Sequence, residues 1–152
     1  YSIGGCGIEP YFEISFDFYE KTNVEACYLL GDFGVNVGGR VEMIADAKWL
    51  SAGDFTKQGF PYFGGRMVLM ANVPNGHYRL QTDEMLCALA RINGETLAFS
   101  PYQTEFDVVD GVMRIELAAT RNNMFGCADG AGEHTHILPF GLSTATKLFK
   151  RN

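Results

Sequence analysis

The chain has 152 residues, 12 basic and 18 acidic side chains, and a net charge of −6 at pH 7. This acidic balance argues against a nucleic-acid-binding protein, because such proteins neutralise phosphates with clustered Lys and Arg. The richest apolar run, residues 67–73, is far shorter than the ~18 residues of a membrane-spanning helix. Neither nucleic acid nor a membrane is therefore an expected partner. A chain of this size buries roughly two-thirds of its unfolded surface, so we expect one domain over residues 1–152.

The chain begins with Tyr1, and no charged, apolar leader follows. We therefore expect a piece of a larger multidomain protein and leave its compartment, cytoplasmic or secreted, open. The four cysteines, Cys6, Cys27, Cys87 and Cys127, form no Cys-x-x-Cys pair, which argues against a zinc ribbon or a thioredoxin-type centre. We expect free thiols, with Cys87 acting as a small buried hydrophobe in its apolar stretch.

Alternating apolar and polar residues predict three half-buried strands. They are residues 11–18, 35–45 and 113–117. Residues 67–71 and 86–90 are apolar at odd and even positions alike, which is typical of central strands covered on both faces. The one segment with helical character, residues 144–150, is short, so we expect little helix.

Three dipeptides between these runs have the chemistry of two-residue hairpin turns: Asn75-Gly76, Asn93-Gly94 and Asp110-Gly111. Asn, Asp and Gly tolerate the positive φ angles of type I′ turns, whose twist matches that of the flanking strands. Hairpins pair their strands antiparallel. The predicted fold class is therefore all-β, a sandwich of two antiparallel sheets.

Two stretches break the alternation, residues 46–65 and 120–141. Both are long for hairpin loops, and long ordered loops on a rigid β scaffold often carry binding groups. We therefore look for functional residues in these two stretches.

Three blocks between residues 29 and 123 form an ordered pattern. The first block, residues 29–35, contains Gly31-Asp32-Phe33-Gly34. The second, residues 49–65, has an aromatic residue, then Gln-Gly-aromatic-Pro and aromatic-Gly before an expected central strand. The third, residues 87–122, contains a strand that ends in Ile92-Asn93-Gly94, and it closes on Thr120-Arg121-Asn122. In this order the blocks resemble the galactose-binding-like jelly-roll domain, the sugar-binding domain of family 2-type glycoside hydrolases and their relatives.

The resemblance implies a jelly-roll sandwich that packs beside the catalytic barrel of a parent glycoside hydrolase. In family 2-type enzymes both catalytic carboxylates belong to that barrel, so the resemblance implies that this chain is not itself an enzyme. Its implied partners are the parent's catalytic domain and a carbohydrate. The residues agree, since the chain has no Gly-x-Ser-x-Gly nucleophile elbow and no phosphate-binding glycine loop.

Sugar binding requires a flat apolar face for the C–H groups of the ring and planar polar side chains for its hydroxyls. The second block and the residue after it supply both. The candidate substrate-binding residues are Trp49, Asp54, Gln58, Tyr62 and Arg66, with Phe55 and Phe63 as further aromatic platforms. The competing interpretation is structural: Trp49 covers the core, and Gly64-Gly65 lets the chain turn into the next strand.

His134 and His136 would point to one face of a strand, which suggests a cupin-like metalloprotein as an alternative. Further ligands are lacking after residue 136, so we predict neither a transition-metal site nor a cofactor. A structural calcium ion is left open, because several Asp side chains could supply its oxygen ligands. These are Asp32, Asp54 and Asp129.

The leading hypothesis is a non-catalytic, carbohydrate-binding accessory domain of a glycoside hydrolase. The alternatives are a stand-alone carbohydrate-binding module or lectin, the cupin-like metalloprotein, and a structural sandwich without a ligand.

Overall fold

The structure is a computed structural model that describes residues 2–4, 11–13, 15, 28–37, 41–97, 100–124 and 137–151. The chain divides into two compact units, Tyr1–Leu30 and Gly31–Asn152, and each is considered by itself below. The prediction of one domain over residues 1–152 stays a prediction. The described residues form strands and two short 3-10 helices joined by turns and irregular segments, and no α-helix occurs among them.

The smaller unit contains one described hairpin. Strand β1 (Ser2–Gly4) pairs antiparallel with β2 (Tyr11–Glu13), and Ile3 lies opposite Phe12. The predicted strand over 11–18 is therefore confirmed over Tyr11–Glu13. Cys6 and Cys27 lie outside the described residues.

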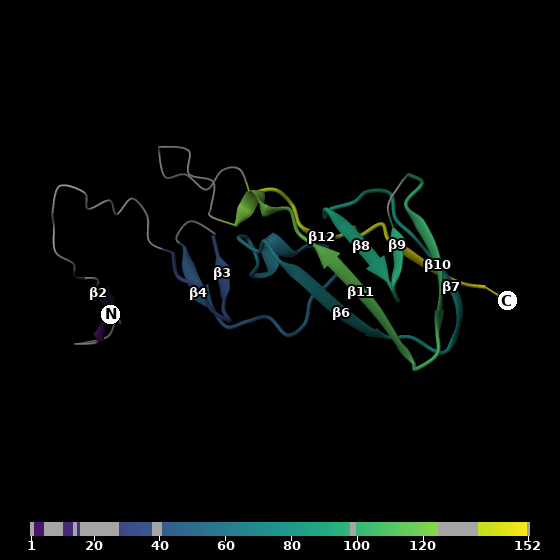
Figure 1. Cartoon of the computed structure of the whole chain (residues 1–152), viewed down its shortest axis with the longest axis horizontal. Coiled ribbons are helices and arrows are strands. Elements are labelled where there is room, and N and C mark those ends of the chain that lie inside the picture. Colours follow the sequence, from purple (N-terminus) through teal and green to yellow (C-terminus); the bar gives the residue numbers. More distant parts are fainter. Residues whose placement is uncertain are drawn as a thin grey trace. The chain divides into compact units, whose positions relative to one another are not determined.

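The larger unit is built on two antiparallel sheets (Figure 1). The four-stranded sheet has the order β6 (Arg66–Asn72), β11 (Val112–Ala118), β8 (Leu89–Ile92) and β9 (Glu95–Leu97). The three-stranded sheet has the order β10 (Gln103–Val108), β7 (Gly76–Gln81) and β13 (Lys147–Arg151). Both sheets contribute to one core. The predicted all-β sandwich of two antiparallel sheets is confirmed.

The period of two in the sequence decides which side chains enter the core. On β11, Met113, Ile115 and Leu117 are buried and Arg114 faces solvent, as predicted for residues 113–117. Each aliphatic side chain buried in this way contributes roughly 1.5–3 kcal/mol to stability. The buried apolar residues are Phe55, Tyr78, Leu80, Ala90, Ile92, Leu97, Phe106, Val108, Met113, Ile115, Leu117 and Phe140.

One of the three predicted hairpins is confirmed. Strands β8 and β9 pair across Asn93 and Gly94, whose φ angles of 48° and 92° fit the positive-φ turn expected there. The predictions at residues 75–76 and 110–111 are wrong, because at each the chain leaves one sheet and enters the other.

These two crossings form a single folded ribbon. Val108 lies opposite Gly76 in one sheet and Val112 lies opposite Asn72 in the other, so the pairing continues in the same register through both sheets. The corner is held by the Gly111 amide, which donates to the Asn75 side chain at 2.8 Å. The Asn and Gly residues that suggested hairpins therefore stabilise a bend between sheets.

Two small sheets flank the sandwich. Strand β3 (Gly34–Asn36) pairs with β4 (Glu42–Ile44), and β5 (Gly53–Asp54) pairs with β12 (Gly141–Leu142). The 3-10 helix η1 (Phe55–Gln58) follows β5, and η2 (Arg121–Asn123) follows β11. The single strand predicted over 35–45 is wrong, since this range holds most of β3 and all of β4, which run antiparallel to each other.

Three further predictions need correction. Residues 67–71 belong to β6, which is an edge strand with Val68 and Met70 exposed, and therefore is not covered on both faces. Residues 86–88 form bends, and only the end of the predicted 86–90 strand lies in β8. The segment 144–150 is not helical: its last four residues begin β13, which pairs with β7.

Cys87 is a free thiol that packs against the core. Burial raises the pKa of this thiol to about 11, so it stays protonated and inert at neutral pH. This agrees with its predicted role as a small hydrophobe.

Candidate functional site

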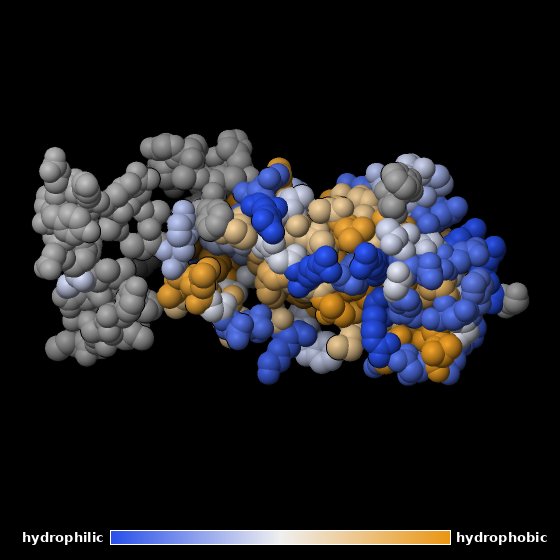
Figure 2. Space-filling model, in the orientation of Figure 1, coloured by the Kyte–Doolittle hydropathy of each residue, from blue (hydrophilic) through white to orange (hydrophobic). Residues whose placement is uncertain are grey.

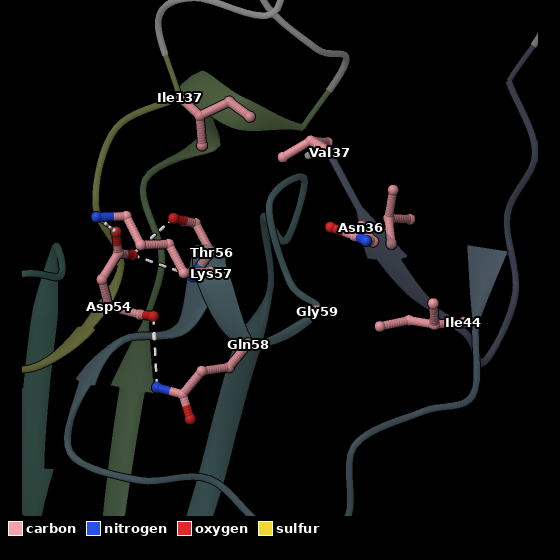
Figure 3. A pocket seen from close by; sticks show the side chains of 10 residues that line it. Asn36, Val37, Ile44, Asp54, Thr56, Lys57, Gln58, Gly59 and Ile137 are labelled. Carbon is pink, nitrogen blue, oxygen red and sulfur yellow. Dashed lines mark hydrogen bonds and ion pairs between the residues drawn. The ribbon is translucent and has the colours of Figure 1, made fainter. Parts of the chain in front are cut away.

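The candidate site is a cavity of about 600 Å³ between the β3–β4 hairpin and the segment that contains β5 and η1. In Figure 3 the side chains of Asn36, Val37 and Ile44 lie across the space from those of Asp54 and Gln58. The lining residues are Val35, Asn36, Val37, Ile44, Asp54, Thr56, Lys57, Gln58, Gly59 and Ile137.

Asp54 organises the polar wall. Its Oδ1 accepts hydrogen bonds from the Thr56 amide at 3.0 Å, the Thr56 hydroxyl at 2.7 Å and the Phe140 amide at 3.3 Å. The carboxylate therefore caps η1 and ties it to the segment before β12. Its Oδ2 faces Lys57 Nζ at 3.9 Å, and the Lys57 side chain is 84% exposed.

Gln58 closes the loop that precedes β5. Its Nε2 donates to the Ser51 carbonyl at 3.0 Å, and its Oε1 accepts from the Ser51 amide at 2.9 Å. Nε2 also donates to the Asp54 carbonyl at 3.4 Å. The amide head of Gln58 thus fixes residues 51–58 as a rigid wall, as the dashed lines in Figure 3 show for its bond to Asp54.

The opposite wall is mainly aliphatic, with the amide of Asn36 among its side chains. Val35, Val37 and Ile44 come from the β3–β4 hairpin and its flank, and Ile137 closes one end. The hairpin is attached to the polar wall by the Val35 amide, which donates to the Gly59 carbonyl at 2.8 Å. At Gly34 a Cβ atom would lie 3.2 Å from the Gly59 carbonyl oxygen, so a glycine lets the two backbones approach closely.

Aromatic packing supports the polar wall from the core side. Phe55 is 1% exposed and meets Phe140 edge-on at 5.7 Å, while Phe63 stacks on Phe140 at 5.4 Å. Phe55 is therefore a core residue, and its expected role as a sugar platform is wrong. Phe63 is half-buried, and its stacking on Phe140 commits one of its faces to the protein.

The five predicted site residues do not form one group. Asp54 and Gln58 line the cavity, whereas Trp49, Tyr62 and Arg66 do not. Trp49 is 92% exposed, which contradicts the alternative that it covers the core. Arg66 donates to Glu116 Oε1 at 3.2 Å on the outer face of the four-stranded sheet.

Of the ten residues that line the cavity, the sequence pattern identifies only Asp54 and Gln58 as site candidates. Asn36 and Ile44 belong to a stretch whose pattern predicts only a strand, and Lys57 has no distinguishing signal in the sequence. The alternation of Val35 and Val37 marked an apolar face, but nothing in the sequence indicates that this face lies opposite residues 54–58.

Most candidate metal ligands named from the sequence lie outside the described part of the chain. His134, His136 and Asp129 lie outside it, as does Cys127. Among the described residues, no group of three His, Cys, Asp or Glu side chains is placed to hold a metal ion. Asp54, one of the calcium candidates, has its Oδ1 committed to three donors.

No helix within the described ranges has the length and apolarity needed to cross a membrane.

Comparison with known proteins finds no matching family, no matching curated protein and no matching solved structure. The functional argument therefore depends on the residues of the chain itself.

A second polar cluster lies on the outer face of the three-stranded sheet, where β7, β10 and β13 bring His77, Glu105, Asp107 and Arg151 together. His77 Nδ1 lies 2.8 Å from Asp107 Oδ1, and its Nε2 lies 3.6 Å from Glu105 Oε2. Arg151 donates to Glu105 at 3.1 Å. The hydrogen bond to Asp107 is the main cause of a raised pKa at His77, with Glu105 adding to it.

We expect His77 to titrate above its ordinary pKa of about 6.5. Because the pKa of His77 is higher in the folded state than in the unfolded state, protonated His77 stabilises the fold. This stabilisation is fully present below about pH 6.5 and is lost as the pH rises through the raised pKa. An NMR titration of the imidazole, with its signal assigned by means of His77→Gln, measures the pKa of His77. Asp107→Asn should lower the pKa of His77, whereas Asp110→Asn, which removes a partner of Arg114, should not. An unchanged pKa in Asp107→Asn would contradict the assignment.

Proposed function

We propose that the unit Gly31–Asn152 is a carbohydrate-binding accessory module of jelly-roll type, belonging to a larger glycoside hydrolase. The observation that carries the proposal is the cavity with one polar wall and one mainly aliphatic wall that also presents Asn36. Its volume of about 600 Å³ lies in the range of small-molecule sites, roughly 300–1,000 Å³. The antiparallel ribbon that passes from one sheet to the other supports a jelly-roll form.

The two walls suit the two sides of a sugar ring. The C–H face of a pyranoside would pack on Val37 and Ile44. Its hydroxyls would form hydrogen bonds with the lone pairs of Asp54 that the protein leaves unused and with the Lys57 ammonium group. Gln58 has its amide engaged with Ser51, so we propose that it positions the wall. Binding by the isolated chain should be weak, because an open site buries little ligand surface.

Titration of the chain with galactosides, glucosides and rhamnosides, followed by calorimetry and NMR, tests the proposal. At least one of these sugars should bind, with shifts of the amides of residues 35–37 and 54–59. Lys57→Ala removes one exposed charged donor and should weaken binding about tenfold. The matched control is Val109→Ala, another exposed position at the corner of the sandwich, which should leave affinity unchanged.

Trp49→Ala distinguishes binding in the cavity from binding on the most exposed aromatic candidate, Trp49. If Trp49→Ala abolishes binding and Lys57→Ala does not, the sugar sits on the exposed indole and the cavity assignment is wrong. If no galactoside, glucoside or rhamnoside binds, the proposal of sugar binding is wrong and the chain is a structural module. The purified chain should not cleave nitrophenyl glycosides, and cleavage would refute the accessory role.

A further inference from the structure

Strand β6 is an unusually unprotected sheet edge. It has seven residues, Arg66–Asn72, and its second edge pairs with no other described strand. From Met67 to Asn72 it contains no charged residue and no proline, although natural edge strands usually carry such features to prevent pairing with another chain. Its outward-facing Val68 and Met70 are 55% and 71% exposed. Figure 2 shows apolar side chains open to solvent over this part of the sandwich.

The other edges of the two main sheets differ from β6. The edge strand β13 carries Lys147, Lys150 and Arg151, β10 carries Glu105 and Asp107, and β9 is described over only three residues, Glu95–Leu97. Charge or shortness therefore blocks pairing at those edges, and β6 stands apart from them.

The inner row of β6 is also incompletely covered. Met67, Leu69 and Ala71 pack against the core but are only partly buried, whereas their neighbours Met113 and Ile115 on β11 are buried. An additional strand beside β6 would cover these side chains as well as the outer ones.

We propose that β6 pairs antiparallel with β6 of a second copy of this chain, joining two four-stranded sheets into one. The strand is self-complementary about Leu69. In that register Val68 lies opposite the other copy's Met70, and Arg66 lies opposite its Asn72, so apolar residues meet apolar ones and no like charges face each other. Arg66 is in addition neutralised within its own sheet by Glu116 at 3.2 Å.

The register allows a charge test that each folded monomer tolerates. Val68 lies beside Glu116 in its own sheet and Met70 lies beside Arg114, so Val68→Lys and Met70→Glu each place a charge next to an opposite one. In a homodimer of either variant, the two introduced charges would lie on a diagonal roughly 7–8 Å apart and repel each other. When the two variants are mixed, the new Lys lies opposite the new Glu.

Sedimentation equilibrium of the full chain measures the outcome, with circular dichroism to verify folding. We expect a concentration-dependent dimer, a dissociation constant raised about tenfold in each single variant, and recovery in the mixture. The control Val109→Lys, at an exposed corner position outside β6, should dimerise like the parent chain. The proposal is overturned if the chain stays monomeric at every concentration, or if neither β6 substitution changes the dissociation constant of the dimer. It is also overturned if each substitution weakens dimerisation but mixing the two variants does not restore it.

Discussion

Replacing Phe55 with alanine should lower the free energy of unfolding by about 3–5 kcal/mol, the usual cost of removing a buried phenylalanine. Phe55 is 1% exposed and meets Phe140 edge-on. Its amide donates to the Phe140 carbonyl at 2.6 Å, and its carbonyl accepts from the Phe60 amide at 3.1 Å. The ring therefore fills the core at the point where η1 starts.

Urea denaturation of Phe55→Ala and Trp49→Ala provides the measurement and its control. Both residues are aromatic and lie six positions apart, but Trp49 is 92% exposed, so its truncation should cost less than about 0.5 kcal/mol. If the two substitutions cost the same, the indole packs on the core in solution and the arrangement of this loop is wrong. Phe55→Ala should also weaken ligand binding at the cavity, because Asp54 and Thr56 flank the missing ring.

The core of the sandwich could be predicted because its signal is local. The alternation around Met113, Ile115 and Leu117 requires only that a strand has one face inward, and the structure buries all three. The turn at Asn93-Gly94 is local in the same way, since two positive φ angles in succession specify a tight hairpin.

The topology could not be predicted from the same local chemistry. Asn75-Gly76 and Asp110-Gly111 bend the chain, but the bend does not determine whether the next strand returns to the same sheet. That outcome depends on the pairing of β6 with β11 and of β7 with β10, which are far apart in sequence. The segment 144–150 shows the same limit: its weak helical preference is overridden by pairing with β7.

The candidate site was predicted in part. The residue types of a binding loop pointed to Asp54 and Gln58, and both line the cavity. Their hydrogen bonds to Thr56, Phe140 and Ser51 show that they also build the loop, and no sequence pattern separates a binding carboxylate from a capping one. The aliphatic wall comes from residues 35–44, which precede the polar wall in the chain, and from Ile137, which lies far beyond it. Only the tertiary structure brings these residues to the site.

Gly141→Ala should be as damaging as the loss of a core aromatic ring, at least about 3 kcal/mol. Gly141 has a φ of +153°, and a Cβ atom there would overlap the carbonyl oxygen of Gly53 and lie 3.2 Å from the Phe55 ring. The obstacle is backbone, so it cannot rotate away. The substitution would separate β12 from β5, the pairing that places Gly141 opposite Asp54.

Gly94→Ala is the matched control for this prediction. Gly94 also has a positive φ, +92°, but a Cβ atom there meets nothing within 4 Å, so only the strain of the left-handed backbone remains, about 1–2 kcal/mol. Comparing the two by urea denaturation isolates the steric overlap at Gly141. Equal losses would mean that β5 and β12 are not tightly paired in solution. Since that pairing holds Asp54 against the Phe140 amide, a loosely paired Gly141 would also leave the polar wall of the cavity without its anchor.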